Sequence, residues 1–229
     1  MKNICRLLIA LFFLSATFVL SAQESPFSFG VKAGFNISNT SFEVDEFHGY
    51  KKKEPKPGFN VGITAGYAFT KAFSVQSGVS YTTKGVKAKG FTQWIPTGQE
   101  YWEHRFNMGY LQLPLMAQYT LRITDDFNFF FQAGPYIAYG ISGKTTSKYR
   151  FYDLNDKPNE KEKTDVFDDD GLKRFDWGLT AGLGTELNRI FIVFNYELGL
   201  VDISGNKSLL PNNPAFKHRN TSLSFGYRF

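Results

Sequence analysis

The chain has 229 residues, of which 17% are aromatic and 21 are glycine, and its formal net charge is +5. Its mean hydropathy is slightly polar, which excludes a bundle of membrane-spanning helices. Phe, Tyr, Val, Ile and Thr combined with frequent Gly favour an all-β protein, and the length suits one domain.

The first 22 residues have the composition of a secretory signal peptide. Lys2 and Arg6 flank the start of an almost unbroken apolar run over residues 7–20, and small residues follow up to Ala22. A membrane anchor is the alternative, but the run is shorter than the ~20 apolar residues that a spanning helix needs. We expect cleavage after Ala22, which leaves one domain over residues 23–229.

The mature chain offers no thiol and little excess charge. Cys5 is the only cysteine and lies in the signal segment, which removes disulfides, thiolate metal sites and cysteine catalysis from consideration. Cleavage also removes two cations and no acid, so the net charge falls to +3. That surplus is too small to indicate a nucleic-acid partner.

Eight segments of the mature chain alternate apolar and polar residues, which is the period of a β-strand with one apolar face. They cover residues 27–38, 59–69, 73–82, 110–121, 127–141, 175–187, 190–200 and 221–229. Each is at least the ~9–11 residues that a tilted strand needs to cross a bilayer. Pro114 cannot donate a ladder hydrogen bond, so we expect a bulge or a local register defect there.

Long polar stretches and short turns alternate between these segments. The long stretches, predicted to be solvated loops, cover about residues 39–58, 84–105, 143–173 and 202–216, and the short turns fall at 70–71, 124–126 and 188–189. Short turns on one side and long loops on the other are typical of an outer-membrane barrel. The predicted fold is therefore all-β: an eight-stranded antiparallel transmembrane β-barrel of the outer membrane, with both termini periplasmic and four loops facing outward.

A soluble lipocalin-like barrel is the competing architecture, and it would place the apolar face inside around a ligand. Alternation alone does not say which face is inside. Two features favour the membrane barrel. The polar positions are rich in Gly, Ser, Asn and Thr, which fit a narrow interior, and they carry a few charges of both signs instead of a dense Lys/Glu surface.

Two strand-forming motifs resemble a known family. They read Tyr-Leu-Gln-Leu-Pro-Leu over residues 110–115 and Phe-Asp-Trp-Gly-Leu-Thr-Ala-Gly-Leu-Gly-Thr-Glu-Leu over 175–187. In this order and separation they are similar to the outer membrane protein β-barrel domain family that includes PorT, and the resemblance covers about residues 24–229. It implies a small outer-membrane barrel, and PorT itself is associated with type IX secretion. It implies no catalytic residue and no cofactor.

Five charged residues share the polar positions of the strands and are predicted to form a charge network in the barrel interior. They are Lys32, Asp176, Glu186, Glu197 and Arg228. An unpaired buried charge is costly, so we expect Arg228 and Lys32 near Glu186 or Glu197. A network that plugs the interior is the favoured interpretation, and a polar conduit or gate is the alternative.

The sequence predicts no catalytic, cofactor-binding or metal-binding residues, and hence no enzyme. The histidines His48, His104 and His218 fall in predicted loops or at strand ends, and Ser222 is too far along the strand from His218 for direct contact. The acidic stretch 168–171 lacks the ligand spacing of a calcium-binding loop, so a solvated turn is expected.

Partners are expected to be the lipid and lipopolysaccharide around the barrel, the barrel insertion machinery, and secretion-system or surface proteins, with no nucleic acid. Residues 51–56 could contact lipopolysaccharide phosphates. Phe229 is predicted to be an assembly signal because it resembles the C-terminal aromatic that the insertion machinery recognises. Six loop aromatics could anchor a partner or pack within extended hairpins: Trp94, Tyr101, Trp102, Tyr149, Phe151 and Tyr152.

The leading function hypothesis is a non-enzymatic structural or loop-mediated interaction protein of the outer membrane. Its first alternative is an accessory component of type IX secretion, which follows from the resemblance. A small-solute channel or a lipid A-modifying enzyme is the second alternative.

Overall fold

The computed structural model describes residues 26–41, 50–94, 98–152, 160–167, 171–204 and 215–229. The predicted signal peptide and its cleavage site lie outside these residues. Within this part of the chain no helix is long and apolar enough to cross a membrane. The strands are β1 (Phe27–Thr40), β2 (Tyr50–Ala68), β3 (Phe73–Trp94), β4 (Gly98–Arg122), β5 (Phe127–Tyr152), β6 (Glu160–Asp165), β7 (Phe175–Leu187), β8 (Ile190–Gly199) and β9 (His218–Arg228).

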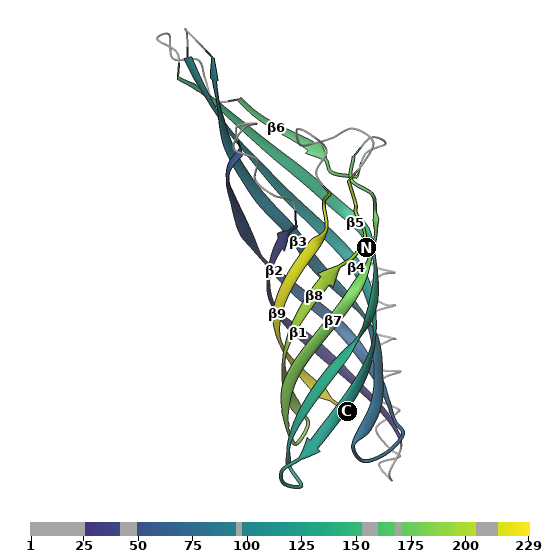
Figure 1. Cartoon of the computed structure of the whole chain (residues 1–229). Coiled ribbons are helices and arrows are strands. Elements are labelled where there is room, and N and C mark those ends of the chain that lie inside the picture. The colour runs from purple at the N-terminus through teal and green to yellow at the C-terminus, as the bar shows by residue number, and fades with distance from the viewer. Residues whose placement is uncertain (1–25, 42–49, 95–97, 153–159, 168–170, 205–214) are drawn as a thin grey trace, which may run out of the picture.

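Eight of these nine strands close into an antiparallel barrel. The strands β1 to β5 pair in chain order, β5 also pairs with β7, and β8 and β9 follow. Pairing of β1 with β9 completes the ring, whereas β6 is attached to β5 outside it (Figure 1). The predicted fold class is confirmed, with β6 as a ninth strand that the sequence analysis missed.

The strands are strongly staggered around the barrel. A row of directly paired residues that starts at Phe27 returns to β1 at Ile37, ten residues further along the strand. The row passes through Tyr67, Val75, Ala117, Ala133, Ala181, Tyr196 and Thr221. A barrel of eight staggered strands has an interior just wide enough for side chains to fill it.

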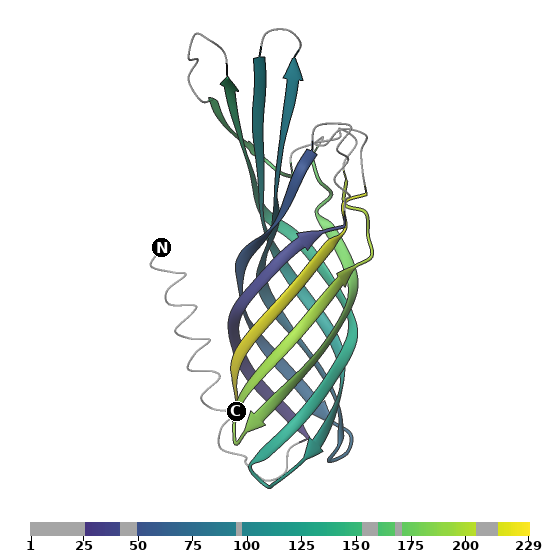
Figure 2. The ribbon, with the colours of Figure 1, turned by 60° about the vertical axis from the view of Figure 1, so that its left-hand side comes forward.

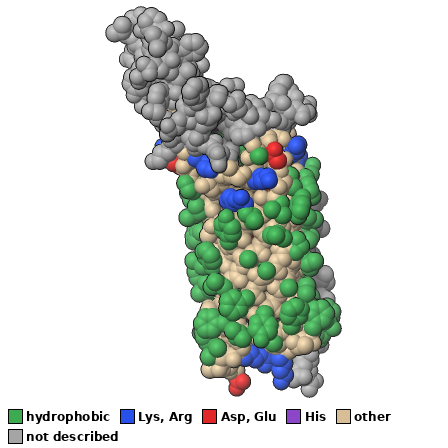
Figure 3. All heavy atoms as spheres, viewed as in Figure 1, with side chains coloured by type: hydrophobic (Ala, Val, Ile, Leu, Met, Phe, Trp, Pro, Cys, Tyr) green, Lys and Arg blue, Asp and Glu red, His purple; other side chains and the backbone are tan. Residues whose placement is uncertain are grey.

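The apolar positions of every barrel strand face outward. Phe35 is 74% exposed and Ile63 is 62% exposed, whereas the intervening Asn36 is 2% exposed. Figure 3 shows hydrophobic side chains spread over the barrel on the face in view, between basic side chains at its upper and lower borders. We call this outward-facing apolar surface of the strands the apolar band. So large an exposed apolar surface is stable in a lipid bilayer and not in water, so the membrane barrel is confirmed over the lipocalin-like alternative.

Three of the four predicted loops are wrong over much of their length. The strand β2 already begins at Tyr50, β3 and β4 continue to Trp94 and from Gly98, and β5 runs to Tyr152. With β6 they form an external sheet above the apolar band, made of residues 50–56, 84–94, 98–108, 143–152 and 160–165 (Figure 2). This sheet stands at the end of the barrel opposite the short turns.

The polarity of the two strand faces reverses at the upper border of the apolar band. On β3, Val86 and Ala88 point inward and are fully buried, whereas Lys87 and Lys89 lie on the other face. The pleat continues unchanged, but water replaces lipid outside, so the apolar side chains now lie within. Because the apolar positions change from one strand face to the other, the alternation is interrupted in the sequence, and the segment resembles a polar loop.

Pro114 does not shift the strand register. The pairs on either side of it, Ser77 with Leu115 and Ser80 with Gln112, are in the same register, and Pro114 itself remains paired with Tyr136. The irregularity in the pairing of β4 with β5 lies instead between Gly109 and Tyr110. The predicted defect at Pro114 is therefore wrong, because a missing donor interrupts the ladder to β3 without inserting a residue.

Candidate functional site

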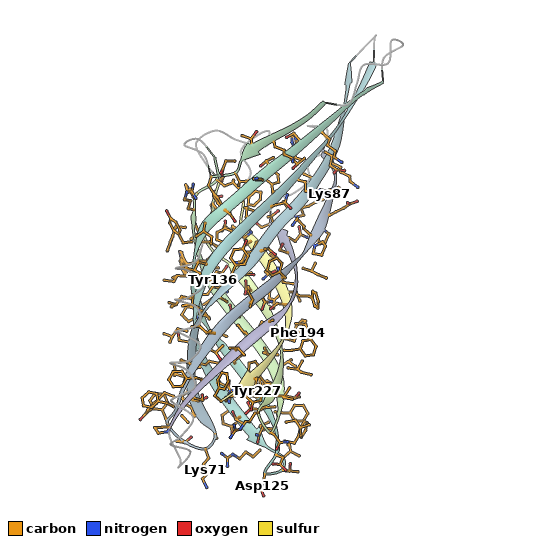
Figure 4. All side chains as sticks on the ribbon, turned by 180° about the vertical axis from the view of Figure 1, so that it is seen from behind. Lys71, Lys87, Asp125, Tyr136, Phe194 and Tyr227 are labelled. Carbon is orange, nitrogen blue, oxygen red and sulfur yellow. The ribbon has the colours of Figure 1, made fainter. Side chains whose placement is uncertain are left out.

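The barrel interior contains a buried group of three charged residues centred on Lys84. Its Nζ lies 3.3 Å from Asp176 Oδ2 and 3.3 Å from Glu197 Oε2, and the side chain of Lys84 is fully buried. The hydroxyl of Tyr136, a residue labelled in Figure 4, donates a hydrogen bond of 3.2 Å to Asp176 Oδ2. Three strands, β3, β7 and β8, thus supply the charges, and β5 supplies the hydroxyl.

Amides and aromatic rings complete the surroundings of these charges. Gln112 Nε2 donates to Glu197 Oε1 at 2.9 Å, and Asn220 Nδ2 donates to Glu197 Oε2 at 3.1 Å. The rings of Tyr136 and Tyr110 lie 4.5 Å and 5.5 Å from Lys84 Nζ, within the range of cation–π attraction. Hydrogen bonding of this kind compensates part of the desolvation that buried charges suffer.

An aromatic and aliphatic cluster closes the barrel above Lys84. The hydroxyl of Tyr110 lies 3.1 Å from His218 Nε2, and its ring packs edge-on against Phe167 at 5.8 Å. Phe106 and Phe216 form a second edge-on pair at 5.8 Å. The buried members are Val86, Ala88, Phe106, Met108, Tyr110, Tyr136, Ala138, Val166, Phe167, Leu172, Ile203 and Phe216. This cluster is packed like the hydrophobic core of a soluble protein, and it fills the upper end of the barrel interior.

The short-turn end is closed by a different group. Arg228 Nη1 lies 2.9 Å from Glu186 Oε2, and the Arg228 guanidinium lies 5.7 Å from the centre of the Phe191 ring. Phe191 packs with Phe130 and Val193 in a small buried cluster. Ion pair and rings together fill the lower part of the interior.

A polar cavity of about 40 Å³ lies between the two closed ends. Four buried polar atoms on its wall have no hydrogen-bond partner among the described residues: Asn60 Nδ2, Gln112 Oε1, Gln132 Oε1 and Thr180 Oγ1. Lys32 also lines the cavity. The volume is enough for roughly two or three waters, which such unpaired groups ordinarily bind.

The five charged residues predicted for the interior do face it, but only part of the predicted pairing is present. Arg228 and Glu186 form an ion pair. Glu197 and Asp176 instead share Lys84, which the sequence analysis assigned to a loop. Lys32 lines the same cavity as Glu197, yet within the described residues no ion pair joins the two. Continuing the even-numbered positions of 74–82 by one step would have found Lys84.

Two histidines have defined surroundings. His218 is the first residue of β9 and is 1% exposed, with Tyr110 as its partner in place of the more distant Ser222. His104 lies in the external sheet with Nδ1 2.8 Å from Ser147 Oγ, and burial lowers its pKa below the ordinary value. His48 lies outside the described residues.

The outward face of the external sheet is crossed by ion pairs. Lys87 Nζ lies 3.2 Å from Glu103 and 3.5 Å from Glu54, and Lys89 lies 2.8 Å from Glu54. Arg105 Nη2 lies 3.0 Å from Glu103. Burial opposes ionisation of Glu103, but the hydrogen bond and charge of Lys87, with Arg105, outweigh it and hold the Glu103 pKa below its usual value.

Several predicted contact residues cannot be placed in this geometry. The side chains of all six predicted loop aromatics, and those of Lys51 and Lys52, lie outside the described residues, as do residues 168–170. Lys53 donates to the backbone oxygen of Thr40 at 2.6 Å, so its ammonium is bound within the wall. Among the described residues no group of three or more His, Cys, Asp or Glu side chains could hold a metal ion.

The last residue lies at the seam between β1 and β9. The backbone N–H of Phe229 donates to the oxygen of Phe29 at 2.8 Å, and its exposed ring packs edge-on against Tyr227 at 5.4 Å. The ring therefore adds to the apolar surface at the lower border of the band.

A family model agrees with this architecture. It is described as outer membrane protein beta-barrel domain and matches residues 21–205. A comparison with curated proteins gives no match. Similar solved structures include Ail of Yersinia pestis in complex with the heparin analogue sucrose octasulfate, at 18% identity, covering 90% of this chain and all of that chain with a TM-score of 0.42.

Two further structures have the same degree of similarity. The outer membrane protein OprG of Pseudomonas aeruginosa is 15% identical, with 88% of this chain and 95% of that chain covered and a TM-score of 0.42. Neisserial surface protein A is 14% identical, with 87% and 95% covered and a TM-score of 0.38.

Proposed function

The chain belongs to the outer membrane protein β-barrel domain family, and from this premise we propose that it is a non-enzymatic protein that presents its external sheet to a partner at the cell surface. The barrel itself lies in the outer membrane. We propose a signal peptide over residues 1–22, cleaved after Ala22, and assembly through the barrel insertion machinery. Lipopolysaccharide is the proposed lipid partner.

The observation that carries this proposal is the contrast between the closed interior and the extended strands. Packing from Arg228 at one end to Phe216 at the other fills the barrel, with a cavity of only about 40 Å³ between. The strands β3 to β5 meanwhile continue far beyond the apolar band, and β6 pairs with β5 there. A sheet held this rigidly is an adequate platform for recognition, because sites on strands are more precise than sites on loops.

Shortening one hairpin tests the proposal. Ala88 and His104 are directly paired, so replacing residues 89–103 by Asn-Gly should close the β3–β4 hairpin with a two-residue turn and leave the barrel intact. A photo-crosslinking residue at position 148 of the external sheet should capture a surface partner in cells with the full chain and lose it with the shortened one. Position 71, in a short turn, is the matched negative control. Equal capture by both chains would contradict the proposal.

An accessory role in type IX secretion is the second candidate. It is supported by the resemblance of residues 110–115 and 175–187 to the PorT-containing family. A deletion strain should then lose secreted proteins, and the full chain should restore them. If the shortened chain also restored secretion, the role in secretion would belong to the barrel or its periplasmic side and not to the external sheet. Normal secretion in the deletion strain would exclude this candidate.

A small-solute channel and a lipid A-modifying enzyme are the remaining candidates. Steady conductance of the reconstituted protein would favour the channel, and altered lipid A in the deletion strain would favour the enzyme. The packing that closes both ends of the interior supports a closed pore. We expect neither signal.

A further inference from the structure

Four basic side chains lie on the outer wall just above the apolar band. Lys144 comes three residues after the exposed Ile141, and Lys173 comes two residues before the exposed Phe175 at the start of β7. On β9, Arg219 pairs directly with Leu198, and Lys217 lies two residues before Arg219. Figure 3 shows basic side chains gathered at the upper border of the apolar band. We call these four residues the rim cations.

Backbone hydrogen bonds hold the rim cations at this height. The N–H of Lys173 donates to Ile203 at 2.8 Å, and the N–H of Ile203 donates to Phe216 at 3.0 Å, next to Lys217. The oxygen of Lys217 accepts from Ser41 at 2.9 Å. Lys144 pairs with Asn107 on β4. Lys144 and Arg219 lie on β5 and β9, and Lys173 and Lys217 lie in the hydrogen-bonded segments that lead into β7 and β9.

The positive charges of the rim cations are not neutralised within the described residues. No ion pair joins any of the four to a described carboxylate, unlike Lys87, Lys89 and Arg105 of the external sheet. Two carboxylates are near. Asp202 interacts electrostatically with Lys173, and Asp165 is paired in sequence register with Lys144.

Both of these carboxylates are already engaged by backbone donors. Asp202 Oδ1 accepts the N–H groups of Ser204 and Phe216 at 3.0 Å and 2.8 Å. Asp165 Oδ1 accepts the N–H of Phe167 at 2.8 Å. These hydrogen bonds order the local backbone. The two carboxylates keep their charge, but within the described residues neither forms an ion pair with a rim cation.

We propose that the rim cations bind the phosphate groups of anionic lipids in the outer leaflet. The rim is continuous with the lipid-facing band, so the groups beside it are lipid headgroups. Lys offers a compact positive charge and Arg a planar fork of donors, and both suit phosphate. This inference rests on the membrane placement in the proposed function and names the lipid group and the residues that bind it.

The opposite border of the band provides a matched control. Lys71, Arg122 and Arg189 are exposed there, together with the exposed acids Asp125 and Asp126. Figure 4 shows Lys71 and Asp125 at this end of the barrel. The triple variant K173Q/K217Q/R219Q removes three cations from the upper border, and K71Q/R122Q/R189Q removes three from the lower one. All six side chains are at least partly exposed, and both variants should fold.

The test uses the full mature chain refolded in phosphatidylcholine nanodiscs that contain increasing amounts of bisphosphorylated lipid A carrying a dansyl group. Energy transfer from the protein's tryptophans reports lipid A at the barrel surface. Each cation near an anionic membrane surface contributes about fivefold to binding. We expect the upper variant to bind lipid A about a hundredfold more weakly. The lower variant controls for the loss of positive charge as such. Dephosphorylated lipid A with wild-type protein tests whether the phosphate groups are what is recognised.

The proposal predicts that the lower variant loses much less binding than the upper variant, because Asp125 and Asp126 already offset part of the charge at the lower border. It also predicts that dephosphorylated lipid A is not enriched and that K173R/K217R/R219K retains binding. Equal losses in both triple variants would overturn it, as would unchanged binding by the upper variant. Competition by free pyrophosphate at the affinity of lipid A would also overturn it, because the site would then serve soluble phosphates. Heat-modifiable gel migration of each variant verifies the folded barrel, and partner capture at position 148 tests the proposed function separately.

Discussion

Lys84 and Asp176 are 92 residues apart in the sequence, and their side chains meet at 3.3 Å inside the barrel. Neither side chain has any exposed surface. The contact joins β3 to β7 across the interior, with Glu197 of β8 as a third member. Strands that share no ladder are thereby tied to one another through charge.

Replacing Lys84 by Met should strongly destabilise the barrel. The substitution leaves Asp176 and Glu197 buried without their cation, and removal of one member of a buried pair costs about 3–5 kcal/mol. Urea titration of the protein in vesicles, followed by tryptophan fluorescence, measures this loss in the free energy of unfolding.

The matched variants separate charge from packing. Lys84→Met combined with Asp176→Asn and Glu197→Gln should recover most of the loss, because no buried charge is left unpaired. Lys87→Met removes an ion-paired lysine from the outer face of the external sheet and should cost less than about 1 kcal/mol. A full-sized loss in the triple variant would show that Lys84 acts through its shape.

The seam between β1 and β9 requires glycine at position 34. A Cβ there would lie 2.2 Å from the backbone oxygen of Leu223 and 2.6 Å from the Cα of Ser224, so neither contact can be relieved by a side-chain rotation. Gly34→Val should prevent closure, seen as loss of heat-modifiable migration. The adjacent Ala33 faces outward, so Ala33→Val should migrate as the wild type does.

Deleting Phe229 should impair assembly in cells far more than it lowers the stability of refolded protein. The deletion removes one seam hydrogen bond, worth about 1 kcal/mol, and an exposed ring. Phe229→Ala keeps the backbone donor and removes only the ring. If the ring is the assembly signal, both variants assemble poorly in cells, and normal insertion of Phe229→Ala would contradict that role.

The external sheet should loosen as the pH falls below about 6.5, the ordinary pKa of histidine. Burial lowers the pKa of His104, so the folded sheet disfavours the proton that an unfolded strand would bind. Stability is complete above the ordinary pKa and declines as the pH falls through it toward the folded value. Amide exchange of residues 98–108, corrected for intrinsic rates, should be faster at pH 5.5 than at pH 7.5. The variant His104→Gln should remove this difference between the two pH values.

The strands within the membrane could be predicted from sequence because lipid outside and small polar groups inside give an uninterrupted alternation. Phe35 and Asn36 illustrate it. The external sheet could not be predicted from the sequence, because the apolar positions change strand face where water replaces lipid. Lys87 and Lys89 then appear to belong to a loop. Lys84 was missed for a different reason, because it continues the inward polar positions of its strand one step beyond Thr82 and was assigned to the loop.

The pairing of charges in the interior depends on geometry that the sequence does not contain. Arg228 and Glu186 could be expected together because both are polar positions near the short-turn end. Whether Glu197 meets Lys32 or Lys84 depends on the stagger of the strands and the width of the barrel. The contact of His218 with Tyr110 could not be predicted for a related reason, because Tyr110 comes from the far wall of the barrel.

The pairing of β1 with β9 also determines when the protein can finish folding. Phe35 and Leu223 are direct neighbours on adjacent strands, so the seam forms only after almost the whole chain has been synthesised and delivered. Until then both strands have unpaired edges that can bind other chains. We therefore expect the chain to need chaperones that keep it unfolded before the seam closes, and its assembly to be more sensitive to their loss than that of a protein built from local contacts.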